Sequence, residues 1–251
     1  MATRARAEIG HWTRREWSFE DVGNHWDFTE DYEEINKGTY SYFRRFEDGL
    51  RLSSLAEGGR ILDFCSRTGN GTAFFFECGK VESAVCADVS FGMRAACVRR
   101  LKEAGLKNWL WVPVDDYKLA VKSGSFDSVL CFETVEHFPN PELLIREMGR
   151  VTRLGGGLIL TTPNVLWEPI HAIASMLNLH HSEGPHRFIR LAALEPMIER
   201  AGFRIVGSET TVLVPGGPKV FVKIGEWIEK HTRSTLMPLL GLRRVIFAIR
   251  V

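Results

Sequence analysis

The sequence predicts an α/β fold built on an open, mostly parallel sheet of seven strands with helices on both faces. Short apolar runs alternate with helical stretches from about Gly59 to Gly207, the pattern expected when crossover helices join parallel strands. The chain has 251 residues, of which 45% are hydrophobic and 25% charged, enough for one such domain with additions. We expect an N-terminal helical cap over residues 1–57 and the main domain over residues 58–251.

The cap is rich in aromatic residues and acidic, with twelve acidic and eight basic side chains in residues 1–57. Residues from about Asp31 to Leu55 are expected to be helical. Two interpretations stay open. The cap is a packing layer on the core, or it is a lid in which Tyr40, Tyr42 or Arg44 faces the site.

Six strands and four helices are expected in the main domain, followed by a seventh strand. The apolar runs that predict strands are Ile61–Phe64, Ala84–Ala87, Trp109–Val112, Ser128–Phe132, Leu158–Thr162, Phe203–Ser208 and Arg244–Val251. The helical stretches are Gly71–Cys78, Phe91–Ala104, Pro141–Arg150 and Leu191–Ala201. Gly105 and Gly202 stand where helix C-caps belong.

Two apolar inserts, Val165–Pro185 and Val214–Leu242, interrupt this alternation and are expected over the edge of the sheet that holds the site. Within the second, apolar residues share one helical face and charged residues the other. The apolar positions are Val220, Phe221, Ile224, Trp227 and Ile228, and the charged ones are Lys219, Lys223, Glu226 and Lys230.

Bulk properties exclude several classes of protein. A formal net charge of +1 disfavours nucleic acid as a partner. The five cysteines form no CxxC pair, which favours a reducing compartment. The first ten residues lack the apolar core of a signal peptide, and no apolar run is long enough to span a membrane. We therefore expect a cytoplasmic protein.

A turn after the first strand and acids after three strands indicate a nucleotide-type cofactor. Asp63 ends the first strand, Asp88 the second, and Asp115 and Asp116 follow the third. The carboxyl ends of parallel strands share one edge, where a turn leading into a helix aims backbone N–H groups at a ligand and an acid can accept from ribose hydroxyls. A nicotinamide dehydrogenase would need Gly-x-Gly-x-x-Gly, which this turn lacks.

These residues, as a set, resemble the class I S-adenosylmethionine-dependent methyltransferases, in the subgroup labelled methyltransferase type 11. The similarity covers about Gly59 to Gly207. It rests on the strand and turn Ile61–Gly69, the acids Asp88 and Asp115, and four further stretches, which are Gly124–Leu130, Glu136–Pro141, Gly155–Gly157 and Thr162–Asn164. The resemblance implies a Rossmann-like fold, S-adenosylmethionine as cofactor and S-adenosylhomocysteine as product.

The resemblance also implies which residues bind the cofactor. They are Asp63, Phe64, Cys65, Ser66, Arg67, Gly69, Asp88, Val89, Met93, Asp115, Asp116, Tyr117, Phe132 and Glu133. The turn departs from the family pattern Gly-Cys-Gly-Thr-Gly, since it reads Cys65-Ser66-Arg67-Thr68-Gly69 and keeps one glycine of three. Arg67 can pair with the methionine carboxylate of the cofactor, or it can point to solvent. Loss of cofactor binding is a third reading.

The turn after the fourth strand holds the candidate catalytic residues, His137 and Glu136. A base is needed only if the acceptor carries a proton, and histidine is suited to that role. If the turn is helical, Glu133, Glu136 and His137 share one face. The resemblance also allows these three to hold a divalent ion in some members, but we expect no metal here. His181, His186 or Arg187 lie near the expected substrate entrance.

The substrate is not fixed by the resemblance. Phe132-Glu133-Thr134-Val135 replaces the Asn/Asp-Pro-Pro-aromatic loop of adenine-amino methyltransferases, so base methylation is disfavoured. The apolar inserts favour methyl transfer to an O or N atom, less readily C, of a small molecule with an apolar, even lipid-like, portion. From Gly216 to Val251 there are seven basic and two acidic residues. Residues 218–244 can form a lid, a homodimer contact or a peripheral contact with the inner membrane face. A non-catalytic cofactor-binding scaffold is the alternative to an enzyme.

Overall fold

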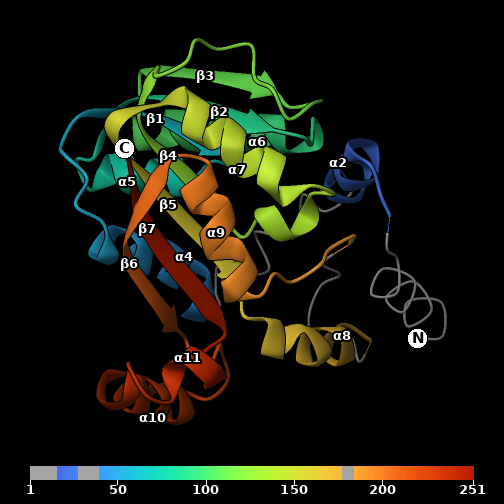
Figure 1. The fold of residues 1–251 in the computed structure, drawn as a ribbon, viewed down its shortest axis with the longest axis vertical. Helices are drawn as coiled ribbons and strands as arrows, with labels where there is room; N and C mark the ends of the chain where they lie inside the picture. The colour runs from blue at the N-terminus through green and yellow to red at the C-terminus, as the bar shows by residue number, and fades with distance from the viewer. Residues whose placement is uncertain (1–15, 28–39, 177–183) are drawn as a thin grey trace.

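The computed structural model describes residues 16–27, 40–176 and 184–251, and these contain a single seven-stranded sheet (Figure 1). The strands are β1 (Gly59–Phe64), β2 (Val81–Asp88), β3 (Asn108–Pro113), β4 (Phe126–Phe132), β5 (Thr152–Pro163), β6 (Phe203–Thr211) and β7 (Arg243–Arg250). The expected strands are confirmed, each with somewhat wider bounds at one or both ends.

The strand order is β3-β2-β1-β4-β5-β7-β6. The first five strands run parallel, with Leu62 of β1 paired to Val85 of β2 and Val129 of β4. β7 runs antiparallel to both β5 and β6 and lies between them. The sheet is therefore mixed but mostly parallel, as the sequence predicts, and the chain order reverses beside β1, where open α/β sheets place their ligands.

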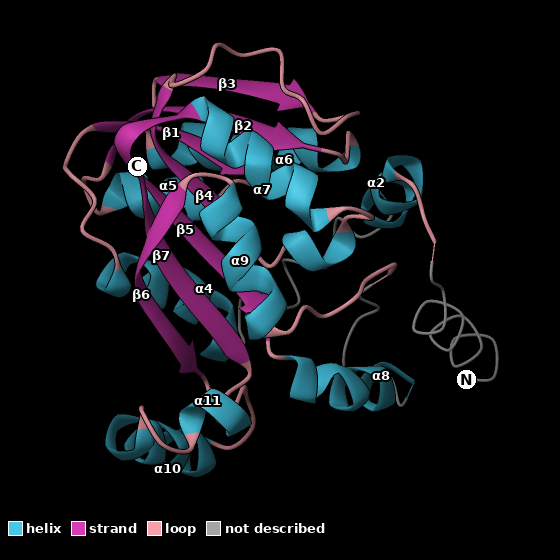
Figure 2. Ribbon diagram, viewed as in Figure 1, coloured by secondary structure: helices cyan, strands magenta, loops and turns pink. Residues whose placement is uncertain are grey.

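Helices cover both faces of the sheet (Figure 2). One face is covered by α7 (Pro141–Val151) and α9 (Leu191–Arg200), which contribute Leu144, Met148 and Leu194 to a buried cluster. The other face is covered by α4 (Tyr40–Leu52), α5 (Asn70–Glu77) and α6 (Gly92–Ala104), whose buried residues include Phe46, Phe75 and Leu101. Both faces of the parallel strands are thus apolar, which explains why these strands appear in the sequence as continuous apolar runs.

The cap and the two inserts form the remaining helices. α2 (Phe19–Asp27) and α4 precede the sheet, η2 (Val165–Trp167) and α8 (Glu168–Met176) follow β5, and α10 (Lys219–Thr232) and α11 (Met237–Leu240) join β6 to β7. The expected helix Asp31–Leu55 is wrong at its C-terminal end, because α4 stops at Leu52, and residues 31–39 lie outside the described chain. No helix in the described parts of the chain is long and apolar enough to cross a membrane.

Candidate functional site

The turn between β1 and α5 keeps the backbone of a glycine-rich loop without most of the glycines. Cys65 has φ +56°, Arg67 φ +49° and Gly69 φ +75°. These are the three positions at which the resemblance predicts glycine. A side chain in the left-handed region costs about 1–2 kcal/mol per residue. The conformation that brings the backbone close to a ligand is therefore retained at a cost, which marks the turn as a functional element.

Neighbouring groups hold this strained turn in place. The N–H of Ser66 donates to the carbonyl of Ala87 at 3.2 Å, and the N–H of Arg67 donates to Asp88 Oδ2 at 2.6 Å. At the helix start, Asn70 Nδ2 donates to Thr68 Oγ1 at 3.0 Å and to the Tyr42 hydroxyl at 2.9 Å. The turn is thus attached to β2 and to the cap, which is how a strained backbone persists.

The acids at the strand ends differ in environment. Asp63 is buried and accepts from the N–H and hydroxyl of Thr72 at 3.1 and 2.7 Å, so it orients the turn. Asp88 is buried and accepts from Arg67 N and, at Oδ1, from Ser90 N at 2.8 Å. Each carboxylate oxygen can accept more than one hydrogen bond, so Asp88 keeps capacity for further hydroxyl donors. Asp115 is exposed, beyond the end of β3.

Other residues of the predicted cofactor set lie around the same edge. Phe64 and Met93 are fully buried, and Met93 packs against α2. Asp116 is exposed and accepts from the Tyr117 N–H, while the Tyr117 hydroxyl accepts from the N–H of Asn140 at 2.7 Å. Burial raises the pKa of Tyr117. Asp115, Asp116 and Tyr117 therefore form the outer part of the edge, and the buried part is formed by the turn, Asp88 and β4.

The Arg67 side chain points inward, so the solvent-facing interpretation is wrong. Arg67 is 7% exposed. Its guanidinium carbon lies 4.3 Å from the centre of the Trp26 ring, and Nη2 donates to the Glu133 carbonyl at 3.0 Å. Stacking on an aromatic face suits a guanidinium, whose charge is spread over a plane. The expected methionine carboxylate partner is not tested by this arrangement.

Two small cavities lie beside Arg67. One, of about 10 Å³, is lined by Val22, Trp26, Cys65, Arg67, Asp88, Val89, Glu133, Thr134, His137 and Phe138. The other, of about 20 Å³, is lined by Arg45, Phe46, Asp63, Cys65, Ser66, Arg67, Gly71 and Phe132. Such volumes hold about one water molecule each, whereas ligand pockets span about 300–1,000 Å³. Arg67 and Cys65 line both cavities and stand between them.

The polar groups at this edge of the sheet suit S-adenosylmethionine, but the two cavities are too small to hold it. Ser66 Oγ is buried and has no hydrogen-bond partner among the residues that the structure describes. Ser66 lies in the turn from Cys65 to Gly69, beside Asp88. Buried polar groups that suit a cofactor therefore lie together at the carboxyl edge of the sheet. Arg67 and Trp26 fill the space between the other residues that line the cavities, and both side chains would have to rotate for a cofactor to enter.

The cap contributes different residues from those predicted. Tyr40 and Arg44 contact each other and face α10, and Arg44 Nη2 pairs with Glu229 at 2.7 Å. Tyr42 is buried against Asn70. The expected lid role of these three is therefore wrong as to the residues. The cap residues that line the cavities are instead Val22, Trp26, Arg45 and Phe46. Their aromatic and basic character is visible in the sequence, but their spacing carries no motif.

α2 is attached to the loop that follows β2. Asp27 Oδ1 accepts from Ser90 Oγ at 2.7 Å and from Gly92 N at 3.0 Å, which satisfies a donor at the start of α6. A side chain at Gly23 would place its Cβ 3.1 Å from the carbonyl oxygen of Val89. The close approach of the two backbones brings Trp26 over the site and explains the glycine.

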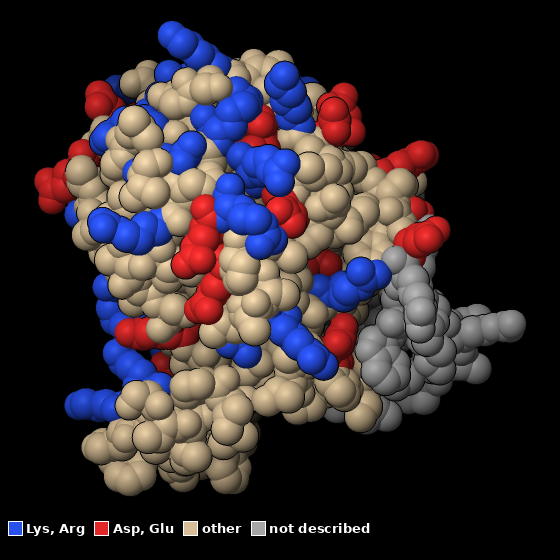
Figure 3. Space-filling view, in the orientation of Figure 1, with Lys and Arg blue, Asp and Glu red and all other residues tan. Residues whose placement is uncertain are grey.

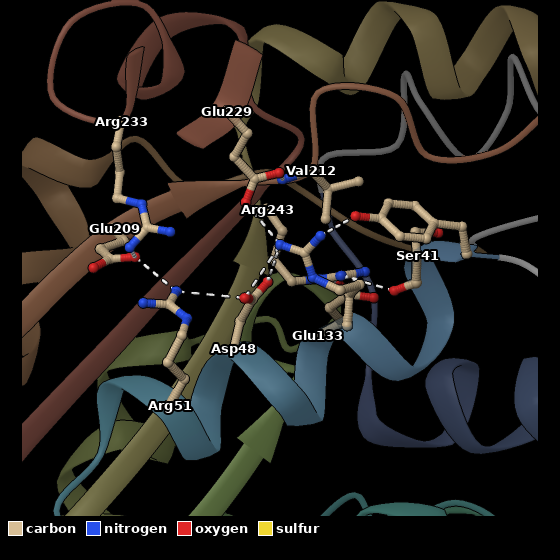
Figure 4. Close-up of polar contacts among 11 residues, drawn as sticks. Ser41, Asp48, Arg51, Glu133, Glu209, Val212, Glu229, Arg233 and Arg243 are labelled. Carbon is tan, nitrogen blue, oxygen red and sulfur yellow. Dashed lines mark hydrogen bonds and ion pairs between the residues drawn. The ribbon is translucent and has the colours of Figure 1, made fainter. Parts of the chain in front are cut away.

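Glu133 lies at the centre of a charged cluster that joins the cap to the sheet (Figure 4). Its carboxylate contacts Arg45 of α4 at 3.4 Å and Nε of Arg243, the first residue of β7. Arg243 also donates to the carbonyl of Ser41 at 2.9 Å. A second group of ion pairs lies beside it, in which Arg44 pairs with Asp48 and Glu229 and Arg51 pairs with Asp48 and Glu209. Glu133 thus lines the first cavity, and its charge holds two arginines.

His137 is buried in the turn after β4 and faces a backbone carbonyl. It lies in the short turn η1 (Val135–His137) and is 2% exposed. Its Nδ1 is 3.1 Å from the carbonyl oxygen of Pro185, and its ring meets Trp26 edge-on with centroids 5.4 Å apart. Because a carbonyl only accepts, a neutral His137 carries its proton on Nδ1 and leaves Nε2 as the acceptor. His137 lines the same cavity as Asp88 and Cys65.

Glu136 turns away from His137. Its Oε2 accepts from the Thr162 hydroxyl at 3.0 Å, and its carbonyl accepts from Arg187 N at 2.8 Å. The expectation that Glu133, Glu136 and His137 share one face is wrong, because Glu133 has φ +49° and the turn is a single 3-10 turn. Within residues 16–27, 40–176 and 184–251, no group of three or more metal-ligating side chains assembles.

The histidines after α8 have separate surroundings. His186 is buried with Nδ1 2.9 Å from the Gly184 carbonyl, and its ring centre is 6.3 Å from that of His137. Arg187 lies over the Trp17 ring at 5.4 Å. His181 lies outside the described residues. His186 and Arg187 therefore lie beside η1, and their place near the substrate entrance stays a prediction.

Cys65 is unsuited to act as a nucleophile. Desolvation, with a further contribution from the Asp88 charge, raises its pKa well above the ordinary thiol value. The thiolate is the reactive form of cysteine, so at neutral pH the side chain stays a small neutral group in the turn.

Comparison with known proteins agrees with this geometry. The family described as "Methyltransferase domain" matches residues 39–208. A ubiquinone biosynthesis O-methyltransferase of Vibrio atlanticus is 27% identical over 202 residues, which cover 75% of this chain and 81% of that protein.

Two solved structures share the fold. A phosphoethanolamine N-methyltransferase 2 of Haemonchus contortus in complex with S-adenosyl-L-methionine superposes with TM-score 0.68 and 16% identity, over 94% of this chain and 60% of that one. The [4+2]-cyclase SpnF superposes with TM-score 0.67 and 18% identity, over 93% and 96%. The second is titled a cyclase, so the architecture alone does not set the reaction.

Three findings agree with one another: the family match over residues 39–208, the mixed seven-stranded sheet, and the buried acids beside the turn from Cys65 to Gly69. The chain therefore belongs to the methyltransferase domain family as a class I S-adenosylmethionine-dependent enzyme.

Proposed function

We propose that this methyltransferase transfers the methyl group to an oxygen or nitrogen atom of a small molecule with a large apolar portion. The observation that carries the proposal is the position of His137, which lines the buried cavity together with Asp88 and Cys65 while its Nδ1 faces the Pro185 carbonyl. S-adenosylmethionine supplies an electrophilic methyl group on a sulfonium sulfur. A base beside it serves an acceptor that must lose a proton, such as a hydroxyl.

The surroundings of His137 support an apolar substrate. The ring meets Trp26 edge-on, and the cavity that it lines is walled by Val22, Val89 and Phe138. Arg67, Asp88, Glu133 and Thr134 line the same cavity, and ligand sites typically combine apolar walls with a small number of placed polar groups. The relative from Vibrio atlanticus reported above is named as a ubiquinone biosynthesis O-methyltransferase, and this supports oxygen as the acceptor atom.

On this proposal, Asp88 accepts from the ribose hydroxyls and the turn from Cys65 to Gly69 supports the methionine end. Arg67 rotates off Trp26 as the site is filled, which opens the space between the two cavities that Arg67 lines. His137 removes the acceptor's proton through Nε2, while Pro185 holds the ring. The walls exclude water from the reacting atoms.

The test combines cofactor binding with transfer. Calorimetry with S-adenosylmethionine and S-adenosylhomocysteine measures the cofactor site. Transfer of a labelled methyl group is then followed with phenols and amines that carry alkyl chains of increasing length, each paired with its unalkylated parent. We expect kcat/KM to rise with chain length. His137→Asn should lower kcat by about 10²–10⁴-fold and leave cofactor affinity nearly unchanged. Equal turnover of the alkylated and parent compounds would overturn the apolar substrate, and unchanged kcat in His137→Asn would overturn the base.

A further inference from the structure

Exposed apolar side chains are concentrated at one end of the molecule. Of the sixteen large apolar residues that are exposed in the described chain, ten lie between residues 166 and 173 or between residues 220 and 240. They come from η2, α8, α10 and α11, which lie together at one end (Figure 1). The members are Leu166, Ile170, Ile173, Val220, Phe221, Ile224, Trp227, Leu236, Leu239 and Leu240, which we call the apolar end. Single exposed apolar residues are ordinary, but a concentration of this kind marks an interaction site.

α10 is divided along its length into three sectors. Gly225 and Glu229 face the body of the protein and are buried. Phe221 and Trp227 face outward and are 57% and 63% exposed. The flank between these two sectors carries Lys219, Lys223 and Lys230, all exposed and spaced so that they lie on one side of the helix. This is the arrangement of a helix that lies in a membrane surface, with apolar residues inserted and lysines at the level of the headgroups.

The acidic residues of α10 offset this charge only in part, because Glu226 alone shares the exposed side of the three lysines and leaves it at net +2. Glu229 is turned inward, where it pairs with Arg44 and accepts from the N–H of Val212. Glu226 is the remaining acid of the helix, against three exposed lysines. The lobe formed by α10 and α11 is largely free of charged side chains on the face seen in Figure 3, with Lys and Arg above it. An anionic lipid surface matches both properties, since it offers apolar chains to the tan lobe and negative headgroups to the lysines.

The apolar end is joined to the site by direct contacts. Trp167 Nε1 donates to the Leu240 carbonyl at 2.9 Å, and Asn164, at the end of β5, donates to the Leu239 and Gly241 carbonyls. On the other side, α10 is held to the cap through Arg44 and Glu229. Arg243, directly after α11, contacts Glu133. A surface bound to α10 and α11 therefore lies next to the carboxyl end of β5 and the amino end of β7, on the same side as the site.

We propose that the apolar end docks the enzyme on an anionic lipid surface, with Phe221, Ile224 and Trp227 inserted among the acyl chains and Lys219, Lys223 and Lys230 at the headgroups. This inference does not depend on which atom the enzyme methylates. It adds a reason why an apolar substrate can be reached, because a substrate dissolved in the membrane would be delivered to the edge that holds His137.

The test is vesicle flotation of the full chain with two lipid compositions, phosphatidylcholine alone and phosphatidylcholine with 30% phosphatidylglycerol. We expect binding to the anionic vesicles, weakened by salt. The double variant Phe221→Ser with Trp227→Ser should bind roughly tenfold or more weakly. Lys223→Gln should bind the anionic vesicles about fivefold more weakly, and its binding to the neutral vesicles should not change. Leu154→Ser is the matched control, because Leu154 is 72% exposed but lies outside the apolar end.

Three outcomes would overturn the proposal. These are equal binding to both compositions, undiminished binding of the double variant, and a loss of binding in Leu154→Ser as large as in the double variant. Analytical sedimentation of the unmodified protein tests whether a second copy of this chain occupies the apolar end instead of lipid. If the protein is dimeric and the double variant is monomeric, the apolar end joins two copies of this chain and the lipid proposal fails. Thermal unfolding shows that each variant is folded, and cofactor calorimetry on the same samples separates a failed surface from a failed cofactor site.

Discussion

The turn from Cys65 to Gly69 and the apolar end break the usual rules of sequence and burial in opposite directions. In the turn, an arginine occupies a glycine position with φ +49° and is 7% exposed. At the apolar end, a tryptophan is 63% exposed. The turn buries charge that water would solvate, and the helix exposes carbon surface that a core would cover. Departures of this kind gather at functional sites, where a local cost is accepted for binding.

The two regions also differ in how they are held. The turn and the adjacent Glu133 are surrounded by hydrogen bonds and ion pairs from β2, α4 and β7. α10 is held mainly through its inner face and the pair between Glu229 and Arg44. A change in the first region should therefore affect stability or cofactor binding, and a change on the outer face of α10 should affect neither.

The largest expected effect is on stability when the buried charge balance is broken. Glu133→Gln leaves Arg45 and Arg243, both 3% exposed, without their shared carboxylate. We expect a loss of about 3 kcal/mol in the free energy of unfolding, measured by urea titration, because an uncompensated buried charge is costly. Glu226→Gln, on the exposed side of α10, should change it by less than about 0.5 kcal/mol. Similar values for both variants would show that burial does not distinguish the two regions.

The next effect concerns the cofactor. Asp88→Ala removes the acceptor for Arg67 N and Ser90 N and, on the proposed role, for the ribose. S-adenosylmethionine should bind about 1–3 kcal/mol more weakly by calorimetry, the usual cost of leaving buried donors without an acceptor. Asp115→Ala is the companion, because its carboxylate is exposed and the expected loss is smaller. A greater loss of affinity in Asp115→Ala than in Asp88→Ala would indicate that the cofactor lies nearer to β3 than we propose.

Arg67→Gly tests whether the buried arginine occupies the cofactor's space. The substitution restores glycine at φ +49° and removes the side chain that stands between the two cavities. We expect about fivefold tighter binding of S-adenosylmethionine, because a larger fraction of the protein is then competent to bind. Cys65→Gly separates the causes, since it relaxes the backbone at φ +56° without emptying the centre. Weaker binding in Arg67→Gly alone would assign the guanidinium to the methionine carboxylate.

The smallest effect is expected at the apolar end. Trp227→Ser should change the free energy of unfolding by less than about 0.5 kcal/mol, because the ring is mostly solvated in the free protein. Differential scanning calorimetry measures this. A loss of more than about 1 kcal/mol would indicate that the tryptophan is packed in solution and that the contrast between the two regions is weaker than the structure suggests.

Local patterns were sufficient to predict most of the fold. The apolar runs located β1, β2, β4 and β5 because these central parallel strands are buried on both faces. Gly105 and Gly202 lie just past the ends of α6 and α9, as expected. The strand bounds were short where polar residues flank an apolar run, as in Val81–Ser83 of β2. The direction and position of β7 could not be predicted, because its pairing with β5 joins residues about 90 positions apart and depends on the whole sheet.

The site was predictable in outline and not in its contacts. Asp63, Asp88 and His137 lie at the edge that the strand pattern implies. The partners of Arg67 and Glu133 come from distant segments, since Arg45 is 88 positions and Arg243 110 positions from Glu133. No spacing rule connects such residues. Arg67 therefore looked as if it could be solvent-facing, and one of the two interpretations of the cap placed Tyr40 and Arg44 in a lid, although their neighbour is α10.

The connection between β6 and β7, which carries most of the apolar end, is free to vary in length because the two strands pair antiparallel. Neighbouring antiparallel strands need only a tight turn between them, yet residues 212–242 are used here. The entropy of closing a loop grows slowly, by about 0.6 kcal/mol for each doubling of length. The segment can therefore lengthen, shorten or be exchanged with little cost to the sheet. On the docking proposal, a change confined to residues 212–242 would alter where the enzyme binds and leave the sheet and the site unchanged.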